Sequence, residues 1–243
     1  MPRNPRRVQL TPGYVLHHQP YRDTSRILEV LTREHGRTSL FARGVRGPKA
    51  KLAAVLQPFR LLLLSWAGRG DAPQLIGAES AGGEVGLPSR ALMAGFYLNE
   101  LILKLTTRHD PLPVLFDAYH AAVAGLRSAA PAEQTLRLFE KRLLEATGYG
   151  LELAVEQQSG RTIESGGWYH FRPSQGLFLT VADAPGAIAG NSLLALAREE
   201  LDDQRTLDDS RRLLQSALGE LLEGRELTTR TVARAVARHE TRQ

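Results

Sequence analysis

No group of residues in this sequence has the spacing of a known catalytic or metal-binding motif. The chain contains no cysteine, which excludes disulfides, thiolate metal ligands and cysteine nucleophiles together. Its seven histidines form no H-E-x-x-H motif, and His17 and His18 would point to opposite faces of a strand. The glycine-containing segment 44–49 has the wrong spacing for a phosphate-binding loop, and no G-x-S-x-G segment is present. We therefore predict a protein without catalytic residues, metal or cofactor.

Two pairs of aspartates, Asp202-Asp203 and Asp208-Asp209, could in principle bind a divalent cation. A helix boundary explains them more simply, because the free N–H groups at a helix N-terminus favour carboxylates. We therefore interpret them as part of a helix start and not as a metal site.

The sequence does suggest binding through charged side chains, because its basic and acidic residues are unevenly distributed along the chain. The 243 residues include 31 Lys and Arg against 26 Asp and Glu, a formal net charge of +5. Residues 1–80 hold 13 of the basic residues and only 5 of the acidic ones, most densely in segment 22–51. Clustered basic residues bind polyanions by neutralising phosphates and releasing counterions. The first third of the chain is therefore a candidate nucleic-acid-binding module, although a solvated surface in an arginine-rich protein would have the same composition.

The elements that would position these basic residues are predicted to be strands. Segments 27–32, 38–43, 59–66 and 74–78 are rich in apolar and β-branched residues and are separated by turn residues, and a further strand begins near residue 8. Segment 44–54 lacks strand character and is predicted to be a loop with a short helix. Five short strands with this insertion before the fourth favour a small closed barrel of the OB type, with an SH3-like barrel as the alternative.

Phe41 lies between arginines in the predicted strand 38–43. Leu40 and Ala42 would face one side of this strand, and Arg37, Phe41 and Arg43 would face the other. An aromatic side chain on a basic barrel face can stack on a base, which contributes about 1–3 kcal/mol per base. Phe41 could instead pack in the core, since phenylalanine is among the most buried residue types. Arg37 and Arg43 are predicted to contact phosphates, a role that needs only position and charge.

The rest of the chain is predicted to be mainly helical. Turn residues around 82–88 mark a boundary, so we predict a barrel domain over 1–80 and a helical domain over 81–243. Helical patterns cover 90–106, 112–126, 131–147, 186–201, 207–223 and 227–240, and a β-hairpin is inserted near 156–182. The predicted fold class is α+β: a five-stranded OB-fold barrel followed by a mainly α-helical domain with a small inserted β-hairpin.

The last predicted helix carries arginine at every fourth position. This spacing forms a basic stripe along one side of the helix. The stripe is either a solvated face or a second surface for phosphates or a partner. Its members are Arg230, Arg234, Arg238 and Arg242.

Four long segments are specific enough to indicate a family. They are residues 13–29 (GYVLHHQPYRDTSRILE), 38–59 (TSLFARGVRGPKAKLAAVLQPF), 95–111 (GFYLNELILKLTTRHDP) and 137–150 (RLFEKRLLEATGYG). Together they resemble the RecO family of bacterial recombination mediators, and the resemblance covers nearly the whole chain. It implies an OB-fold followed by a helical domain, in agreement with the prediction from the residue patterns.

The resemblance also implies a function and a set of partners. Family members are not enzymes: they bind single- and double-stranded DNA, anneal complementary strands and assist the loading of RecA onto DNA coated by single-strand binding protein. The implied partners are DNA, RecR, single-strand binding protein and, in some pathways, RecF and RecA, in the cytoplasm at the nucleoid. An adaptor whose basic face binds an acidic protein is the alternative. The residues expected to bind DNA are Arg22, Arg26, Arg37, Phe41, Arg43, Arg46, Lys49 and Lys51.

Two further expectations concern the helical domain. Many family members carry a four-cysteine zinc site where this chain has residues 156–181, so a chain without cysteine resembles the zinc-free branch. The family also binds the acidic, apolar tail of single-strand binding protein. Arg137, Lys141 and Arg142 are candidates to hold the terminal carboxylate of that tail, with ordinary exposed cations as the alternative.

Overall fold

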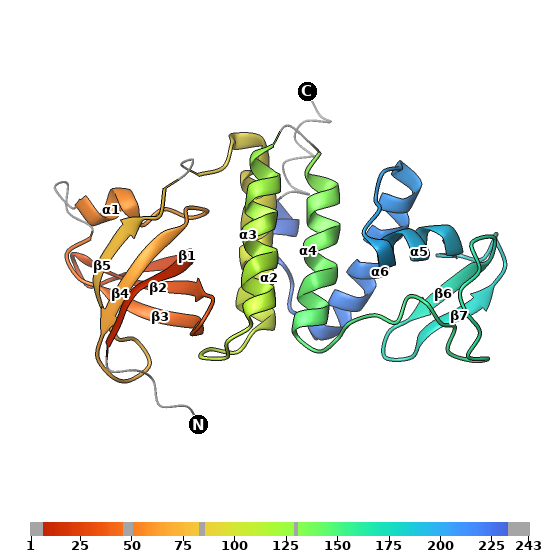
Figure 1. Ribbon diagram of the computed structural model, residues 1–243, viewed down its shortest axis with the longest axis horizontal. Coiled ribbons are helices and arrows are strands. Elements are labelled where there is room, and N and C mark those ends of the chain that lie inside the picture. Colours follow the sequence, from red (N-terminus) through yellow and green to blue (C-terminus); the bar gives the residue numbers. More distant parts are fainter. Residues whose placement is uncertain (1–6, 46–50, 83–85, 129–130, 233–243) are drawn as a thin grey trace. The chain divides into compact units, whose positions relative to one another are not determined.

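The computed structural model describes residues 7–45, 51–82, 86–128 and 131–232. The chain divides into two compact units, which are treated separately below (Figure 1). The first unit comprises residues 1–128 and 227–243, and the second unit comprises residues 129–226. The predicted division into domains at residue 80 stays a prediction.

Five strands of the first unit close into a barrel in the order β1-β2-β3-β5-β4. They are β1 (Arg7–Tyr21), β2 (Ser25–Thr32), β3 (Gly36–Ala42), β4 (Leu62–Ala67) and β5 (Gln74–Ser80), with the short helix α1 (Lys51–Val55) before β4. The long strand β1 pairs with both β2 and β4, and register shifts between Val8 and Thr11 and between Val15 and His17 let it bend around the barrel. The predicted five-stranded OB-type barrel is confirmed.

The barrel core follows the period-two pattern of the strands. Leu28 and Val30 of β2, Leu40 and Ala42 of β3, and Trp66 of β4 are all buried in one apolar cluster. Phe41 points to the opposite face of β3 and is only half-buried. The prediction that Leu40 and Ala42 share one side of the strand is therefore correct.

Two helices follow the barrel in the first unit, which also includes the described residues 227–232. Helix α2 (Leu92–Leu105) follows a single 3₁₀ turn, η1 (Ser89–Ala91), and α3 (Pro113–Arg127) begins at a proline, which suits the first helical turn. A buried chain of hydrogen bonds connects them to the barrel: the Tyr119 hydroxyl donates to Asn99 Oδ1 (2.6 Å), and Asn99 Nδ2 donates to the carbonyl oxygen of Leu16 (2.8 Å). This chain joins α3, α2 and β1 in one packed unit.

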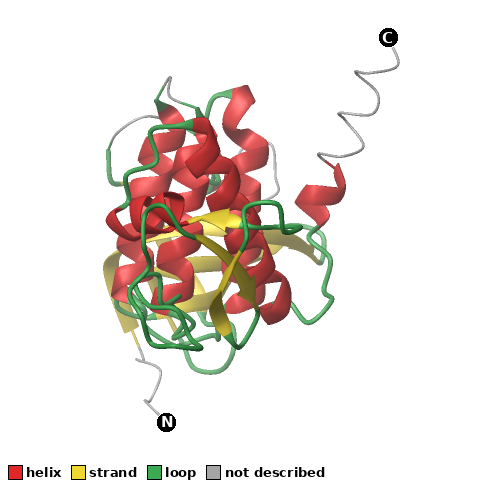
Figure 2. Ribbon diagram, turned by 90° about the vertical axis from the view of Figure 1, so that its right-hand side faces the viewer, coloured by secondary structure: helices red, strands yellow, loops and turns green. Residues whose placement is uncertain are grey.

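The second unit contains helix α4 (Ala132–Ala146), a small antiparallel sheet and two further helices, α5 (Gly190–Arg198) and α6 (Gln204–Leu221). The sheet has the order β7-β6-β8, from β6 (Trp168–Arg172), β7 (Gly176–Thr180) and β8 (Ile188–Ala189), and is the part of this unit nearest the viewer in Figure 2. The predicted hairpin is confirmed as β6–β7, and β8 adds a third short strand. Asp203 is the N-cap of α6, because its Oδ1 accepts a hydrogen bond from the Thr206 N–H (2.9 Å).

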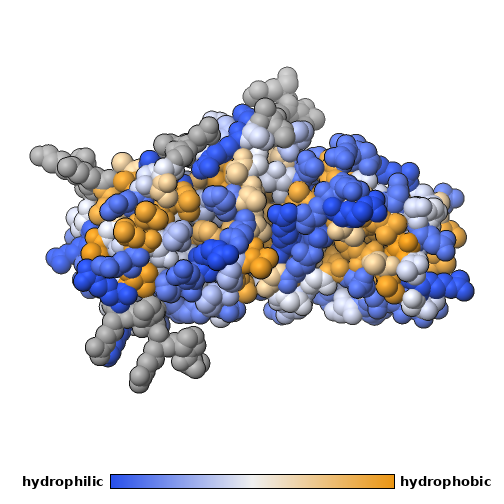
Figure 3. All heavy atoms as spheres, viewed as in Figure 1, coloured by the Kyte–Doolittle hydropathy of each residue, from blue (hydrophilic) through white to orange (hydrophobic). Residues whose placement is uncertain are grey.

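On the face seen in Figure 3, each unit shows apolar patches among hydrophilic residues. Among the described residues, no helix is long and apolar enough to cross a membrane.

Candidate nucleic-acid interface

An aromatic pair lies on the outer face of the barrel, at the end where β1 turns into β2. The rings of Tyr21 and Phe41 meet edge to face with centroids 5.6 Å apart, and Tyr21 is 39% exposed. Phe41 lies opposite Ile27 in the β2–β3 ladder, and the Arg22 guanidinium lies over the Tyr21 ring, 5.4 Å from its centroid. We call Tyr21, Arg22, Ile27 and Phe41 the aromatic patch. Ring faces beside a cation form the kind of surface on which bases stack.

Two of the predicted arginines lie at or beside the aromatic patch. Arg22 and Arg43 are exposed there, whereas Arg26 is half-buried opposite the core residue Ala42 and faces the other side of β2 from Ile27. Burial, together with the positive charge of Arg26, holds the pKa of His18 below its ordinary value. His18 is therefore predominantly neutral at pH 7, and the arginines provide the positive charge of this end of the barrel.

Along β2 and β3, the outer face is more buried the farther its residues lie from the aromatic patch. The pair Ile27–Phe41 is half-buried, the next outward pair, Glu29–Ser39, is buried, and Leu31 beyond it is 2% exposed. The segment that follows α2 covers this end, because the His109 N–H donates to the carbonyl oxygen of Arg37 (2.8 Å). Among the described residues of β2 and β3, those at the aromatic patch are the part of the outer face that is open to a ligand.

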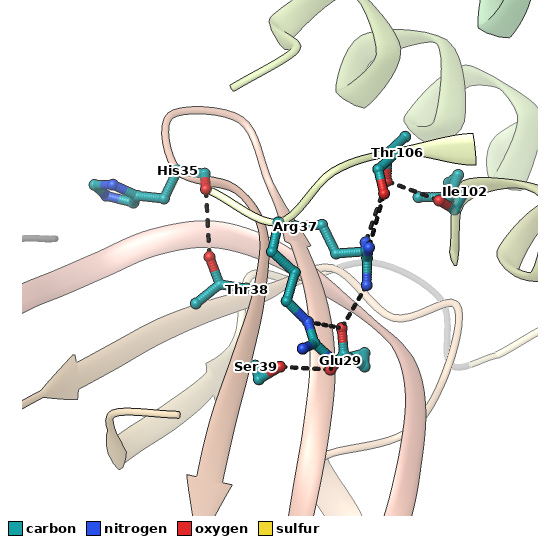
Figure 4. A network of polar contacts seen from close by, with 8 residues as sticks. Glu29, His35, Arg37, Thr38, Ser39, Ile102 and Thr106 are labelled. Atoms are coloured by element: carbon teal, nitrogen blue, oxygen red, sulfur yellow. Dashed lines mark hydrogen bonds and ion pairs between the residues drawn. The ribbon is translucent and has the colours of Figure 1, made fainter. Parts of the chain in front are cut away.

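Arg37 belongs to an internal polar network at the covered end (Figure 4). Its guanidinium donates to Glu29 Oε2 (2.9 Å), to the Thr106 carbonyl oxygen (2.7 Å) and to Thr106 Oγ1 (3.2 Å), and its side chain is only 12% exposed. Ser39 also donates to Glu29. These contacts connect β3 to the end of α2 and engage the Arg37 guanidinium within its own unit, and the phosphate contact of Arg37 stays a prediction.

Glu29 is the acceptor at the centre of this network. Burial would raise the pKa of its carboxyl group, but hydrogen bonds from Arg108, Ser39 and Arg37 outweigh burial and hold the pKa below its ordinary value. Glu29 is therefore ionised at neutral pH, and it accepts from two arginines at once.

Arg108 is a basic residue of this region that the sequence did not indicate. Its guanidinium donates to Glu29 Oε1 (2.6 Å), while its side chain stays 49% exposed. Glu29, which Arg108 contacts, pairs with Ser39 two residues along the strands from the Ile27–Phe41 pair of the aromatic patch, a distance of about 7 Å. No local pattern could have revealed Arg108, because only the folded segment after α2 brings it to the barrel.

Several predicted residues lie outside the described part of the chain. This holds for Arg46 and Lys49 of the barrel loop, for Arg234, Arg238 and Arg242 of the basic stripe, and for the side chain of Lys51 at the start of α1. Arg230 is described: its guanidinium lies over the Tyr97 ring, 5.4 Å from the centroid, and donates to the Tyr97 hydroxyl (3.0 Å). Arg230 therefore packs on its own unit.

The predicted carboxylate clamp of the second unit is already occupied by the chain's own acids. Arg137 donates to Glu140 (2.7 Å), and both side chains are buried. Lys141 Nζ lies 3.2 Å from Glu199 Oε1, and the Arg142 guanidinium also pairs with the Glu199 carboxylate. These three cations are thus not simply solvated, and a partner carboxylate would have to displace Glu199 to reach Lys141 or Arg142.

The described residues contain no group of three or more His, Asp or Glu side chains that could hold a metal ion. A four-cysteine zinc site is impossible in a chain without cysteine. The aromatic patch and its exposed arginines can bind a ligand through stacking and charge.

Comparisons with known proteins find matches over both parts of the chain. Residues 7–82 match the family Recombination protein O N terminal, and residues 89–231 match the family Recombination protein O C terminal. The DNA repair protein RecO of Methylococcus capsulatus is 42% identical over 232 residues, which cover 96% of each chain. The protein of the same name from Nitrosococcus oceani is 45% identical over 226 residues, 92% of each chain, and that from Cupriavidus metallidurans is 39% identical over 93% of this chain and 77% of its own.

Proposed function

This chain belongs to the RecO family of DNA repair and recombination proteins, and we propose that it is a non-enzymatic mediator that binds DNA through the open end of its barrel face. In this proposal it binds single- and double-stranded DNA, anneals complementary strands and assists RecA loading on DNA coated by single-strand binding protein. Its proposed partners are RecR, single-strand binding protein, RecF and RecA, and its proposed location is the cytoplasm at the nucleoid.

The observation that carries this proposal is the aromatic patch between exposed arginines. Tyr21 and Phe41 offer ring surface for bases, and Arg22 and Arg43 offer charge for phosphates. The two kinds of contact occur side by side at the only end of the β2–β3 face that the segment after α2 leaves open among the described residues. A surface for a purely acidic protein would need the arginines but not the rings.

A salt titration of DNA binding tests the proposal. Binding of the full chain to a labelled single-stranded oligonucleotide should weaken with salt, with a log–log slope of about −0.7 for each phosphate contact. Arg22→Ala and Arg43→Ala should each make the slope shallower by about that amount. Arg161→Ala, which removes an exposed arginine from the second unit, is the matched control and should leave the slope unchanged.

Phe41→Leu separates stacking from charge. It keeps an apolar side chain of similar burial but removes the ring, so we expect a loss of single-strand affinity of about fivefold or more, with an unchanged salt slope. Binding that does not depend on salt, or binding by Phe41→Leu and Arg43→Ala that is as strong as that of the wild type, would contradict the proposal.

The adaptor alternative is tested by calorimetry. Titrations with an oligonucleotide and with an acidic peptide would show which of the two the basic face binds. If Arg22→Ala and Arg43→Ala weaken peptide binding and leave DNA binding unchanged, the adaptor function replaces the proposed one.

A further inference from the structure

The second unit is acidic, in contrast to the whole chain. Residues 129–226 hold 16 Asp and Glu against 10 Lys and Arg, whereas the whole chain has a net charge of +5. An acidic surface repels DNA and acidic peptides and attracts basic ones. The chemistry of this unit therefore differs from that of the barrel.

A pocket of about 530 Å³ lies within the second unit. It is lined by the end of α4, residues 149–153, the β6–β7 turn and the end of α6. Its apolar base includes the buried residues Leu144, Leu153, Leu177 and Ala217, and Tyr149 is 57% exposed at its edge. This volume is typical of pockets that bind a ligand or the side chains of a partner.

The charged residues that line the pocket are all acidic. They are Glu152, Glu220 and Glu223, and each is exposed. The lining contains no lysine, arginine or histidine. Glu220 lies in the last turn of the 18-residue helix α6, and Glu223 follows its C-cap residue, Leu222. The negative end of the helix dipole therefore adds to their charge.

The neighbouring contacts leave most of this negative charge in place. Glu220 accepts a hydrogen bond from Ser174, and Glu152 accepts one from the Ala154 N–H (2.9 Å); both donors are neutral. Arg225 donates to the carbonyl oxygens of Leu222 (3.1 Å) and Leu221 (3.3 Å) at the end of α6 and does not line the pocket.

We propose that this pocket binds a short basic segment of a partner protein. An apolar side chain of the segment would cover Leu144 and Leu177, and flanking arginine or lysine side chains would pair with Glu152, Glu220 and Glu223. Charge complementarity selects this occupant, because an acidic tail or a DNA strand would meet three carboxylates at the rim. The surface is independent of the DNA-binding face proposed for the barrel.

Fluorescence anisotropy with the full chain and a labelled synthetic peptide that alternates arginine and leucine tests this proposal. The peptide should bind, a peptide with serine in place of leucine should bind at least about tenfold more weakly, and one with glutamate in place of arginine should not bind. Glu223→Lys should weaken binding by about three- to tenfold, because it replaces an attraction at the rim with a repulsion.

Asp183→Lys is the matched control, since it makes the same charge change at an exposed residue that does not line the pocket. It should change peptide affinity by less than about twofold. Equal losses in Glu223→Lys and Asp183→Lys would show attraction to net charge alone and would overturn the proposal. A photoreactive peptide should crosslink to residues 144–153, 171–177 or 217–223, and crosslinks confined to other segments would equally refute it.

Discussion

Replacing Arg37 with alanine should destabilise the first unit without weakening its contacts to phosphates. The Arg37 guanidinium pairs with Glu29 at 2.9 Å and donates twice to Thr106, while the side chains of Arg37 and Glu29 are 12% and 11% exposed. Alanine would remove all of these hydrogen bonds. It would also leave part of the Glu29 charge and the Thr106 carbonyl oxygen without their donor in a region that water reaches poorly.

The size of the effect follows from this burial. Breaking a buried ion pair by removal of one partner costs about 3–5 kcal/mol, but Arg108 continues to donate to Glu29 and lowers that cost. We therefore expect a loss of about 3 kcal/mol in the free energy of unfolding. For a unit of this size, that loss corresponds to a melting temperature about 6–12 °C lower.

Arg33→Ala is the matched control for this prediction. Like Arg37, Arg33 pairs with an acidic residue: it donates two hydrogen bonds of 3.0 Å to Asp117 of α3. The side chains of Arg33 and Asp117 are, however, 51% and 56% exposed. An exposed pair contributes about 0–1 kcal/mol, so Arg33→Ala should lower the melting temperature by at most a few degrees. Both variants lose one positive charge, which removes net charge as an explanation of any difference.

Calorimetric melts and salt titrations of oligonucleotide binding check the prediction together. Arg37→Ala should melt well below Arg33→Ala and, at a temperature where it is folded, should keep the wild-type salt slope. If Arg37→Ala is as stable as Arg33→Ala and its slope on single strands is shallower by about 0.7, Arg37 contacts phosphate and the connecting role is wrong.

Three further predictions concern the same unit. Gly36→Ala should cost more than about 3 kcal/mol, because Gly36 has φ +62° and an added Cβ would lie 2.1 Å from the Asp110 carbonyl oxygen; a urea titration would measure the loss. Tyr119→Phe should cost about 1–2 kcal/mol in the same titration, since it leaves buried Asn99 Oδ1 without the Tyr119 hydroxyl. Because the folded-state pKa of Glu29 is lowered, its stabilisation is complete above the ordinary value of 4.5 and is lost as the pH falls below it; acid titrations of stability should show a smaller loss in Glu29→Gln.

Each of these predictions has a control in the same chain. Gly70 also has a positive φ, +93°, but an added Cβ would meet nothing within 4 Å, so Gly70→Ala should cost only about 1 kcal/mol from backbone strain. Tyr21→Phe removes a hydroxyl from an exposed ring and should leave stability almost unchanged. Glu79→Gln, at an exposed residue of β5, should keep the acid response of the wild type. A control that loses as much as its test variant would refute the corresponding argument.

The period-two pattern of the strands was sufficient to predict which way the side chains of the barrel point. Leu40 and Ala42 are in the core, and Phe41 is on the outer face, because alternate residues of a strand face opposite sides whatever surrounds it. The excess of basic residues in the first 80 positions and the absence of cysteine are likewise properties of the sequence alone. The basic excess directs attention to a nucleic-acid surface, and the lack of thiols excludes a thiolate zinc site whatever the fold.

Tertiary structure alone decided which arginines on that face can reach a ligand. Arg37 and Arg43 have equivalent places in the strand pattern, yet Arg43 is exposed, whereas Arg37 is bound to Glu29 and Thr106. Arg108, which no strand pattern includes, joins the same carboxylate from 79 residues away. In the second unit, Arg137 likewise belongs to the polar positions of an amphipathic helix but is buried against Glu140. The direction of a side chain depends on the local backbone, but its exposure and its ion-pair partners depend on segments distant in sequence. Local periodicity carries no information about those segments.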